Sequence, residues 1–467
     1  MEPKAFKVII IGGSVAGLTL ALSLSKIGID YVVLEKRETI APQEGASIGI
    51  LPHGGRILEQ LGLFGAVEKF IEPLHTAHIR FPDGYEYSTS SPSVLNDRFG
   101  LPLAFLERRK LLQILFDSQS NKSKILCGKQ LTRIEDFEDS VKIHTADGST
   151  YEGDLVVGAD GVHSRVRAEM WQLADEVKPG KISTAERSSL KVQYACVFGI
   201  SVAVPGLLPG EQVASFNEKR SFLTFPGKNG RVFWFLINRL DQEYPYSSAP
   251  RFSLKDAETI CQQFLEDIIF GDVRFACLWS RKEICSITGL EEGVFPTWSH
   301  RRIVCIGDSM HKMAPNTGQG ANCAIEDAAG LTNTLHACLI KTKRHCKPTT
   351  RELNTILEGY SEGRIHRIKQ IYKASRLVVR LHARETLLLR IMGRYYIPRS
   401  GDVPADAASK MIAGAVALDF LPLPSRSGPG WISFKKSESI LRWWVMGGVI
   451  PVLLIASVWL RWFILKV

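Results

Sequence analysis

The stretch FKVIIIGGSVAG at residues 6–17 decides the fold of this chain. Residues 6–11 are a short, unbroken apolar run, which is typical of a strand buried on both faces of a parallel sheet. Glycines follow at once, residues 18–26 have the composition of a helix, and residues 30–34 form a second β-rich run. This order of strand, glycine turn, helix and strand predicts the opening βαβ unit of an α/β fold.

The glycine turn has the spacing of a dinucleotide-binding fingerprint. Gly12 permits the tight turn, and Gly17 lets the helix pack closely against the strand. Ser14 stands where the fingerprint has its second glycine, through which the backbone approaches a pyrophosphate. Glu35, at the end of the second strand, can accept hydrogen bonds from a ribose 2′-OH and would repel a 2′-phosphate. Together they predict a site for FAD or NAD rather than NADP.

A second motif, GADGVHSRVR at residues 158–167, follows a strand-like run at 154–157. An Asp-Gly turn at Asp160 with two arginines just beyond it suits the neighbourhood of a pyrophosphate. A strand-to-helix turn capped by Asp160 or Ser164 explains the same residues equally well.

A third motif, GDSMHKMAPNTGQGAN at residues 307–322, follows a predicted strand at 302–306. Asp308 at the strand's carboxyl end suits hydrogen bonds to polyol hydroxyls. The glycine-rich loop leads through Gly320 and Ala321 into a helix, whose free N–H groups could face an electron-rich ring or an anion. A long capping loop is the alternative, but the composition is more specific than a cap requires.

The middle of the chain has a different character. Alternating, aromatic-rich runs between about 183 and 290, and a similar stretch at 76–87, indicate an antiparallel sheet. The sequence therefore predicts a Rossmann-like domain assembled from discontinuous segments, with an inserted antiparallel β-sheet domain. The predicted units are a cofactor domain (1–75, 101–182 and 291–370), a substrate-binding sheet domain (76–100 and 183–290), a helical extension and linker (371–440) and a transmembrane anchor (443–464).

The predicted anchor follows a Pro/Gly/Ser-rich linker at 422–430. Residues 443–460 contain no charged side chain and are long enough to span a bilayer core. Tryptophans cluster near the two ends, as in an aromatic belt. A buried C-terminal core helix is the alternative. Basic residues before the segment favour a single-pass protein of the endoplasmic reticulum with its bulk in the cytosol.

The overall composition is that of a globular protein. Hydrophobic residues make up 45% and charged residues 23% of the chain, which excludes a disordered or fibrous protein. The net charge is +10, but the basic residues are scattered, so we expect an anionic cofactor and a membrane surface, not nucleic acid, to explain it. The nine cysteines include no CxxC pair, so neither a disulfide framework nor a metal site is expected.

The three ordered motifs resemble the class A FAD-dependent monooxygenases of the para-hydroxybenzoate hydroxylase type, over residues 6–370. Within that class, EKRETIAPQEGASIGILP (35–52) and FLERRKLLQIL (105–115) look like fungal enzymes of indole-diterpene and meroterpenoid biosynthesis that epoxidise prenyl chains. Ser14 is typical of this subgroup. The resemblance implies FAD contacts from Glu35, Gly49, Arg108, Asp308 and Ala321. Arg108 is matched through the R-x-x-L-x-x-x-L pattern, and an exposed helix arginine is the alternative for it.

The resemblance also implies a mechanism. NAD(P)H binds transiently and reduces the flavin, which reacts with O₂ to give a C4a-hydroperoxyflavin that delivers one oxygen atom. The expected substrate is a membrane-borne isoprenoid, and the expected reaction is epoxidation of a terminal prenyl double bond. Hydroxylation of an activated aromatic ring is the alternative. A third possibility is a non-catalytic flavin-fold protein that escorts prenylated cargo. The presence of Asp308 and the 318–320 loop argues against this possibility.

The sequence offers one candidate catalytic side chain, Tyr194, in the aromatic-lined segment 192–199. Its hydroxyl could assist protonation or orient the substrate. The alternative is an ordinary sheet residue with a satisfied hydroxyl.

Overall fold

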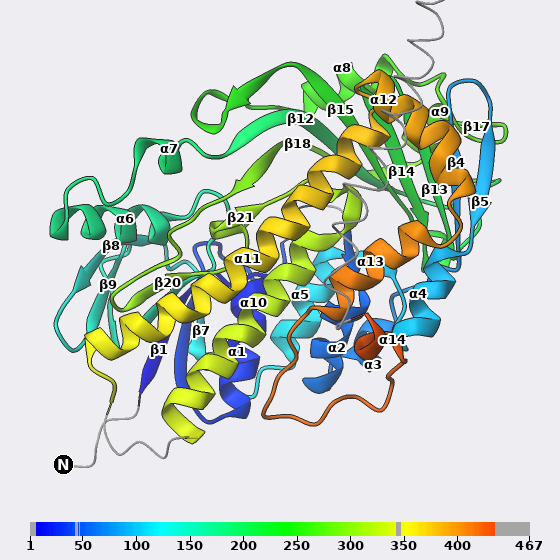
Figure 1. Cartoon of the computed structure of the whole chain (residues 1–467). Coiled ribbons are helices and arrows are strands. Elements are labelled where there is room, and N and C mark those ends of the chain that lie inside the picture. The colour runs from blue at the N-terminus through cyan, green and yellow to red at the C-terminus, as the bar shows by residue number, and fades with distance from the viewer. Residues whose placement is uncertain (1–5, 43–44, 46, 342–346, 435–467) are drawn as a thin grey trace, which may run out of the picture.

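The computed structural model describes residues 6–42, 45, 47–341 and 347–434. Its first sheet has six strands in the order β19-β20-β11-β1-β2-β7, parallel except for β19 (Figure 1). The strands are β1 (Lys7–Ile11), β2 (Asp30–Leu34), β7 (Ile125–Leu126), β11 (Leu155–Gly158), β19 (Ser299–His300) and β20 (Ile303–Cys305). The predicted βαβ opening is confirmed, because the apolar run of β1 lies between two parallel neighbours.

Helices pack on this sheet. Helix α1 (Val15–Lys26) is buried from Val15 to Leu24 on all sides, as its continuous apolar composition requires. Helix α1 packs against α5 (Arg108–Asp117) and α10 (Gln319–Leu335), and α6 (Arg165–Val177) packs against β11 and β20. The helix predicted after the glycine-rich loop is α10, and it begins directly after Gly318.

The second sheet has eight strands in the order β21-β18-β12-β15-β14-β13-β4-β5. They are β4 (Thr76–Arg80), β5 (Glu86–Thr89), β12 (Lys191–Ser201), β13 (Glu211–Asn217), β14 (Arg220–Pro226), β15 (Val232–Pro245), β18 (Lys282–Val294) and β21 (His311–Lys312). All neighbours are antiparallel except β13 and β4. One face packs on α8 (Leu254–Gln262) and α9 (Phe275–Trp279), and the other faces the loop that carries Ala314.

Smaller elements complete the fold. Two short sheets are β3 (Ser47–Ile50) with β6 (Ala104–Glu107), and β8 (Leu131–Asp136) with β9 (Val141–Thr145) and β10 (Thr150–Gly153). The remaining regular elements include α2 (Pro52–Gln60), α3 (Phe64–Glu68), α4 (Ser91–Phe99), α7 (Thr184–Arg187), β16 (Ile268–Phe270) and β17 (Val273–Arg274).

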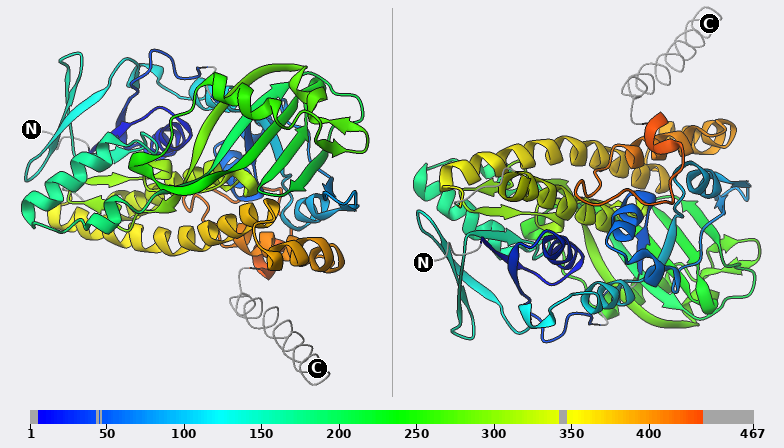
Figure 2. Two further views of the ribbon diagram at one scale, coloured as in Figure 1. Left: turned by 90° about the horizontal axis from the view of Figure 1, so that it is seen from above. Right: turned by 90° about the horizontal axis from the view of Figure 1, so that it is seen from below.

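Helix α11 (Thr350–His382) runs past both sheets, and α12 (Leu387–Ile391), α13 (Val403–Ala413) and α14 (Gly430–Ser433) follow along the same side (Figure 2). A capping box at Thr349 starts α11, which then continues unbroken to residue 382. This helix therefore continues across the boundary predicted between 370 and 371, and the domain division stays a prediction.

The predicted anchor at 443–464 lies outside the described residues. Among the residues that are described, no helix combines the length and the apolar composition needed to cross a bilayer.

Candidate active site

Four predicted site residues follow the carboxyl ends of neighbouring parallel strands. Gly12 follows β1, Glu35 follows β2, Asp160 follows β11 and Asp308 follows β20. Backbone hydrogen bonds continue past the strand ends, from Gly12 N to the β2 end (2.8 Å) and from the residue before Asp160 to the β1 end (2.8 Å). The structure thus brings three separate motifs to one edge, where open α/β sheets bind their ligands.

The two fingerprint glycines leave no room for side chains. Gly12 has φ +108°, and a Cβ there would lie 2.4 Å from the carbonyl oxygen of Ala159. A Cβ on Gly17 would lie 2.0 Å from the carbonyl oxygen of Gly12. Helix α1 then begins without a side-chain cap and without an acid in its first turn. Its first N–H groups are therefore available to an anion.

Ser14 and Glu35 organise this turn. One Glu35 carboxylate oxygen accepts the Gly13 N–H (2.7 Å) and the other accepts the Arg37 N–H (2.9 Å). Ser14 Oγ accepts a hydrogen bond from the Arg108 guanidinium (2.7 Å), which comes from the start of α5. The serine at the second glycine position therefore holds Arg108 beside the fingerprint, whereas the sequence alone could not exclude an exposed helix arginine.

Asp160 acts as a helix cap. Its carboxylate accepts hydrogen bonds from Ser164 Oγ (2.6 Å), Arg165 N (2.7 Å) and Val166 N (3.1 Å) at the start of α6. Arg167 is buried and donates to the carbonyl oxygens of residues 162 and 309. The capping alternative therefore accounts for these contacts, and the second motif ties the first and third motifs together. A cofactor contact from Asp160 stays a prediction.

Asp308 lies in the turn η4 (Gly307–Ser309) after β20 and pairs with Lys312. Burial opposes ionisation of the Asp308 carboxyl, but the nearby Lys312 ammonium outweighs it, so the pKa lies below its ordinary value. Lys312 was not singled out from the sequence. It lies on β21, four residues after Asp308.

Asn322 joins two parts of the site. Its side-chain oxygen accepts the Leu51 N–H (3.0 Å), and its amide donates to the carbonyl oxygens of Gly49 and Gly318 (2.8 Å each). This ties β3, with the predicted residue Gly49, to the start of α10, with Gly320 and Ala321. An added Cβ on Gly320 would meet no described atom within 4 Å, so the start of α10 faces open space.

Replacing Asn322 with alanine should weaken FAD binding about ten-fold or more. The change leaves two buried backbone groups, Leu51 N–H and the Gly49 carbonyl, without this partner, which costs about 1–3 kcal/mol for each unsatisfied group. The measurement is FAD affinity by titration of the apoprotein. Asn333→Ala is the matched control, because that asparagine lies on the same helix but donates to Ala417 O (2.7 Å), away from the motifs. Equal FAD affinity in both variants would contradict the assignment.

A buried charge network stands behind the Asp308 turn. Asp327 Oδ2 accepts the Gly307 N–H (2.9 Å) and contacts His311 Nε2 (2.7 Å). Arg364 from α11 donates to Asp327 (2.8 Å) and also pairs with Glu326. Both carboxylates are fully buried. The sequence does not reveal this network, because its members lie on helices that are distant in the chain.

Tyr194 lies on β12, on the face toward Ala314, and is fully buried. Its hydroxyl donates to Glu385 (2.5 Å), which also pairs with Arg239 (3.1 Å). Burial, followed by the Glu385 carboxylate, raises the pKa of the tyrosine far above its ordinary value. Its hydroxyl is thus satisfied, as in the structural alternative, and a catalytic role stays a prediction.

Around Tyr194, buried side chains of the second sheet pack with Ala314 of the third motif and with residues of α11 in one apolar cluster, which we call the apolar wall. Phe105 and Phe225 stack with their ring centroids 3.7 Å apart. The buried side chains of this wall are Leu74, Ala77, Ile79, Phe81, Phe105, Tyr194, Cys196, Ile200, Ala214, Phe216, Leu223, Phe225, Phe233, Ile237, Leu290, Ala314, Val379 and Ala383.

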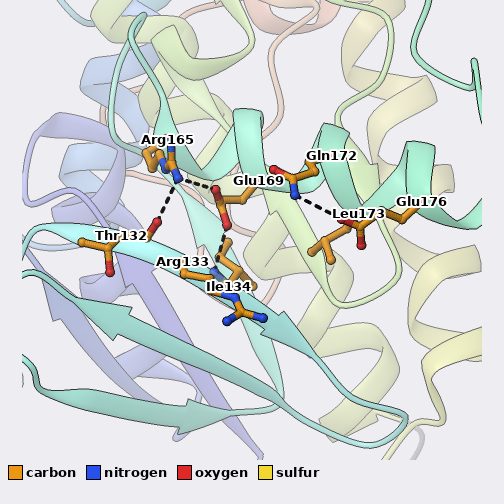
Figure 3. A pocket seen from close by; sticks show the side chains of 8 residues that line it. All are labelled: Thr132, Arg133, Ile134, Arg165, Glu169, Gln172, Leu173 and Glu176. Carbon is orange, nitrogen blue, oxygen red and sulfur yellow. Dashed lines mark hydrogen bonds and ion pairs between the residues drawn. The ribbon is translucent and has the colours of Figure 1, made fainter.

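A hollow of about 240 Å³ lies elsewhere, between β8 and α6 (Figure 3). Its polar groups pair with one another: Glu169 accepts from Ile134 N (3.1 Å) and pairs with Arg165 (2.7 Å), and Gln172 donates to Glu176 (3.1 Å). It contains none of the predicted cofactor residues, so we assign the site to the strand edge instead.

Comparison with known proteins identifies the family. A model described as FAD binding domain matches residues 5–372. The chain belongs to this FAD-binding family. It is 81% identical over 460 residues to FAD-dependent monooxygenase olcE of Penicillium canescens, covering 98% of this chain and 99% of that protein. It is 60% identical to FAD-dependent monooxygenase spyC of Aspergillus fumigatus, covering 93% and 92% of the two chains.

Solved structures share the fold of this FAD-binding protein. Klebsiella pneumoniae HpxO complexed with FAD and uric acid superposes with a TM-score of 0.71 at 21% identity, covering 88% of this chain and 97% of that one. CtdE in complex with FAD and a substrate gives 0.63 at 18% identity, covering 81% and 90%. The predicted class A FAD-dependent monooxygenase and its FAD cofactor are confirmed.

The residues of the strand edge fit FAD. The uncapped start of α1, kept clear of side chains by Gly12 and Gly17, suits the pyrophosphate, with Arg108 beside it. We expect Glu35 to bind the adenosine ribose and Asp308 the polyol chain. FAD, once bound and reduced, supplies the oxygen-activating chemistry. The protein's part is to position the cofactor and the substrate and to keep water out.

Proposed function

We propose that this monooxygenase epoxidises a prenyl double bond of an indole-diterpene or meroterpenoid intermediate in fungal secondary metabolism, with NAD(P)H as the reductant. The apolar wall carries the proposal. Apart from Tyr194, with its satisfied hydroxyl, and the thiol of Cys196, the wall consists of alkyl and aromatic side chains, and it packs against the loop of the third motif through Ala314. Such a surface suits a hydrocarbon chain, because burying apolar area is favourable and no polar partner is needed.

The fungal relatives support the same proposal. The matched proteins olcE and spyC are both FAD-dependent monooxygenases, and they cover this chain almost from end to end. An isoprenoid substrate would partition into a bilayer. We therefore also propose that residues 443–464 anchor the enzyme as a single-pass protein in the endoplasmic reticulum, with the catalytic domain in the cytosol.

The test uses the purified full-length enzyme with FAD, NAD(P)H and ¹⁸O₂. Geranylgeranyl- and farnesyl-bearing aromatic compounds are compared with the same head groups carrying a fully saturated chain. We expect one labelled oxygen in the unsaturated compounds only, recovered as a vicinal diol after acid hydrolysis. Oxygenation of a phenol without a prenyl chain, or of the saturated compound, would instead indicate aromatic hydroxylation.

Replacing Tyr194 with phenylalanine should change kcat by less than about three-fold, while the free energy of unfolding falls by about 1.5–3 kcal/mol, the worth of a hydrogen bond to a charged group. Glu385 keeps its pairing with Arg239 in this variant. Single-turnover kinetics and urea unfolding are the measurements. A loss of kcat above about one hundred-fold with unchanged stability would show that the hydroxyl acts on the substrate.

A further inference from the structure

The segment after α11 exposes large apolar side chains. Leu387 is 72% exposed, Leu388 56%, Ile391 49%, Tyr395 54% and Tyr396 53%. They lie on α12 and on the turn η7 (Met392–Tyr396) that continues it. We call these five side chains the apolar ridge. A concentration of exposed apolar groups within ten residues marks a surface that contacts something apolar.

Basic residues lie on the same segment as the apolar ridge, and two of them pair with carboxylates of neighbouring elements: Arg390 with Glu218 (3.0 Å) and Arg394 with Asp83 (2.8 Å). Residues 386–401 contain Arg390, Arg394 and Arg399 and no acidic residue. Arg394 stacks over the Tyr85 ring at 3.6 Å, and Arg399 donates to the Tyr395 carbonyl oxygen (2.9 Å), so the cations border the ridge in fixed positions. Exposed leucines and tyrosines bordered by arginines are the pattern of a helix that lies in the interface of an anionic bilayer.

The inner side of the same segment packs on the apolar wall. An added Cβ on Gly393 would lie 3.3 Å from a methyl group of Leu381 and 3.9 Å from the ring of Phe81. Phe81 belongs to the apolar wall, which also includes Ala314 of the third motif. The ridge and the wall are therefore the outer and inner sides of one layer.

The last described residues, around Trp431, are followed in the sequence by an uncharged segment. Trp431 is fixed against α4: its ring lies 4.9 Å from that of Phe99, and its indole N–H donates to the Phe99 carbonyl oxygen (3.0 Å). The next residue, Ile432, is 70% exposed. Figure 2 shows α12, α13 and α14 on one side of the molecule. The uncharged residues 443–460 follow in the sequence.

We propose that the apolar ridge docks into the headgroup region of an anionic lipid bilayer. The leucines and the isoleucine insert, the tyrosines lie at the polar boundary, and Arg399 contacts lipid phosphates. Docking places the outer side of the apolar wall at the membrane. A role of this contact in substrate entry rests on the proposed isoprenoid substrate. The docking contact itself does not depend on that proposal.

The test is hydrogen exchange of the full-length enzyme, with and without vesicles of phosphatidylcholine and phosphatidylserine. Amides of 386–400 should exchange at least about five-fold more slowly with vesicles. Peptides around Leu208 and Leu254, which are 59% and 63% exposed but lie outside the ridge, should not change. Unchanged exchange at 386–400 while the enzyme floats with the vesicles would overturn the proposal.

A variant pair separates the ridge from other apolar surface. In the triple change Leu387→Ser, Leu388→Ser and Ile391→Ser, the vesicle-dependent protection should disappear. The matched change Val177→Ser, Leu208→Ser and Leu254→Ser should keep it. Protection that rises with protein concentration without vesicles would indicate a second copy of this chain and would overturn the proposal. Because contact is measured and not turnover, a failure of the epoxidase proposal would leave this result unaffected.

Discussion

Replacing Gly17 with alanine is expected to abolish stable FAD binding. The added methyl group would lie 2.0 Å from the carbonyl oxygen of Gly12, so the turn must open and the start of α1 must move. Overpacking of this kind costs about 3 kcal/mol, and the backbone atom it meets cannot move aside as a side chain could. The flavin-to-protein absorbance ratio after purification should fall at least about ten-fold, since each ten-fold change in affinity corresponds to 1.4 kcal/mol.

Gly363→Ala is the matched control for this prediction. Gly363 is exposed inside α11, and an added Cβ would meet no described atom within 4 Å. Alanine there should raise the free energy of unfolding by about 0.5–1 kcal/mol and leave flavin content unchanged. If Gly17→Ala retained wild-type flavin, the cofactor would not depend on this turn, and the assigned edge would be wrong.

Replacing Arg364 with alanine should destabilise the enzyme by about 3–5 kcal/mol, because breaking a buried ion pair leaves uncompensated charge. Glu326 and Asp327 are fully buried, and Arg364 pairs with both. The FAD content should fall as well, since Asp327 holds the Gly307 N–H of the Asp308 turn. Urea unfolding measures the stability, and the absorbance ratio measures the flavin.

Arg376→Ala is the control on the same helix. Arg376 is 42% exposed and lies 3.7 Å from Glu243, so its loss should cost less than about 1 kcal/mol. A similar cost for both arginines would show that the buried network contributes nothing specific.

The network should also make stability depend on pH. Burial opposes ionisation of Glu326, but Arg364 and Arg367 outweigh it and lower the pKa of that carboxyl to about 2, from an ordinary value of 4.5. A depressed folded-state pKa gives stability that is complete above the unfolded-state value and is lost as pH falls below it. Wild-type stability should therefore decline between about pH 4.5 and pH 2. Arg364→Ala should show a weaker decline, and an equal slope in both proteins would contradict this account.

The sheet edge assigned to the cofactor could be predicted from the sequence, because its residues meet local steric and chemical requirements. The run at 6–11 had to be a buried strand, and the geometry at Gly12 and Gly17 leaves no space for a Cβ. Glu35 directly follows β2, and Asp308 lies in the turn that follows β20, so both could be predicted from the positions of the strands. The predicted FAD cofactor, monooxygenase class and α/β fold are accordingly confirmed.

Contacts between distant segments were decided by the tertiary structure alone. The sequence left Asp160 between a pyrophosphate neighbour and a helix cap, and the hydrogen bonds at the start of α6 account for the cap. Asp327 meets Arg364 through the packing of two helices, and Tyr194 meets Glu385 across 191 positions of the chain. No spacing rule encodes such pairs, because burial of charge depends on which helix faces which. The sequence by itself therefore determined the cofactor and the turn that receives it, whereas only packing determined how that turn is supported.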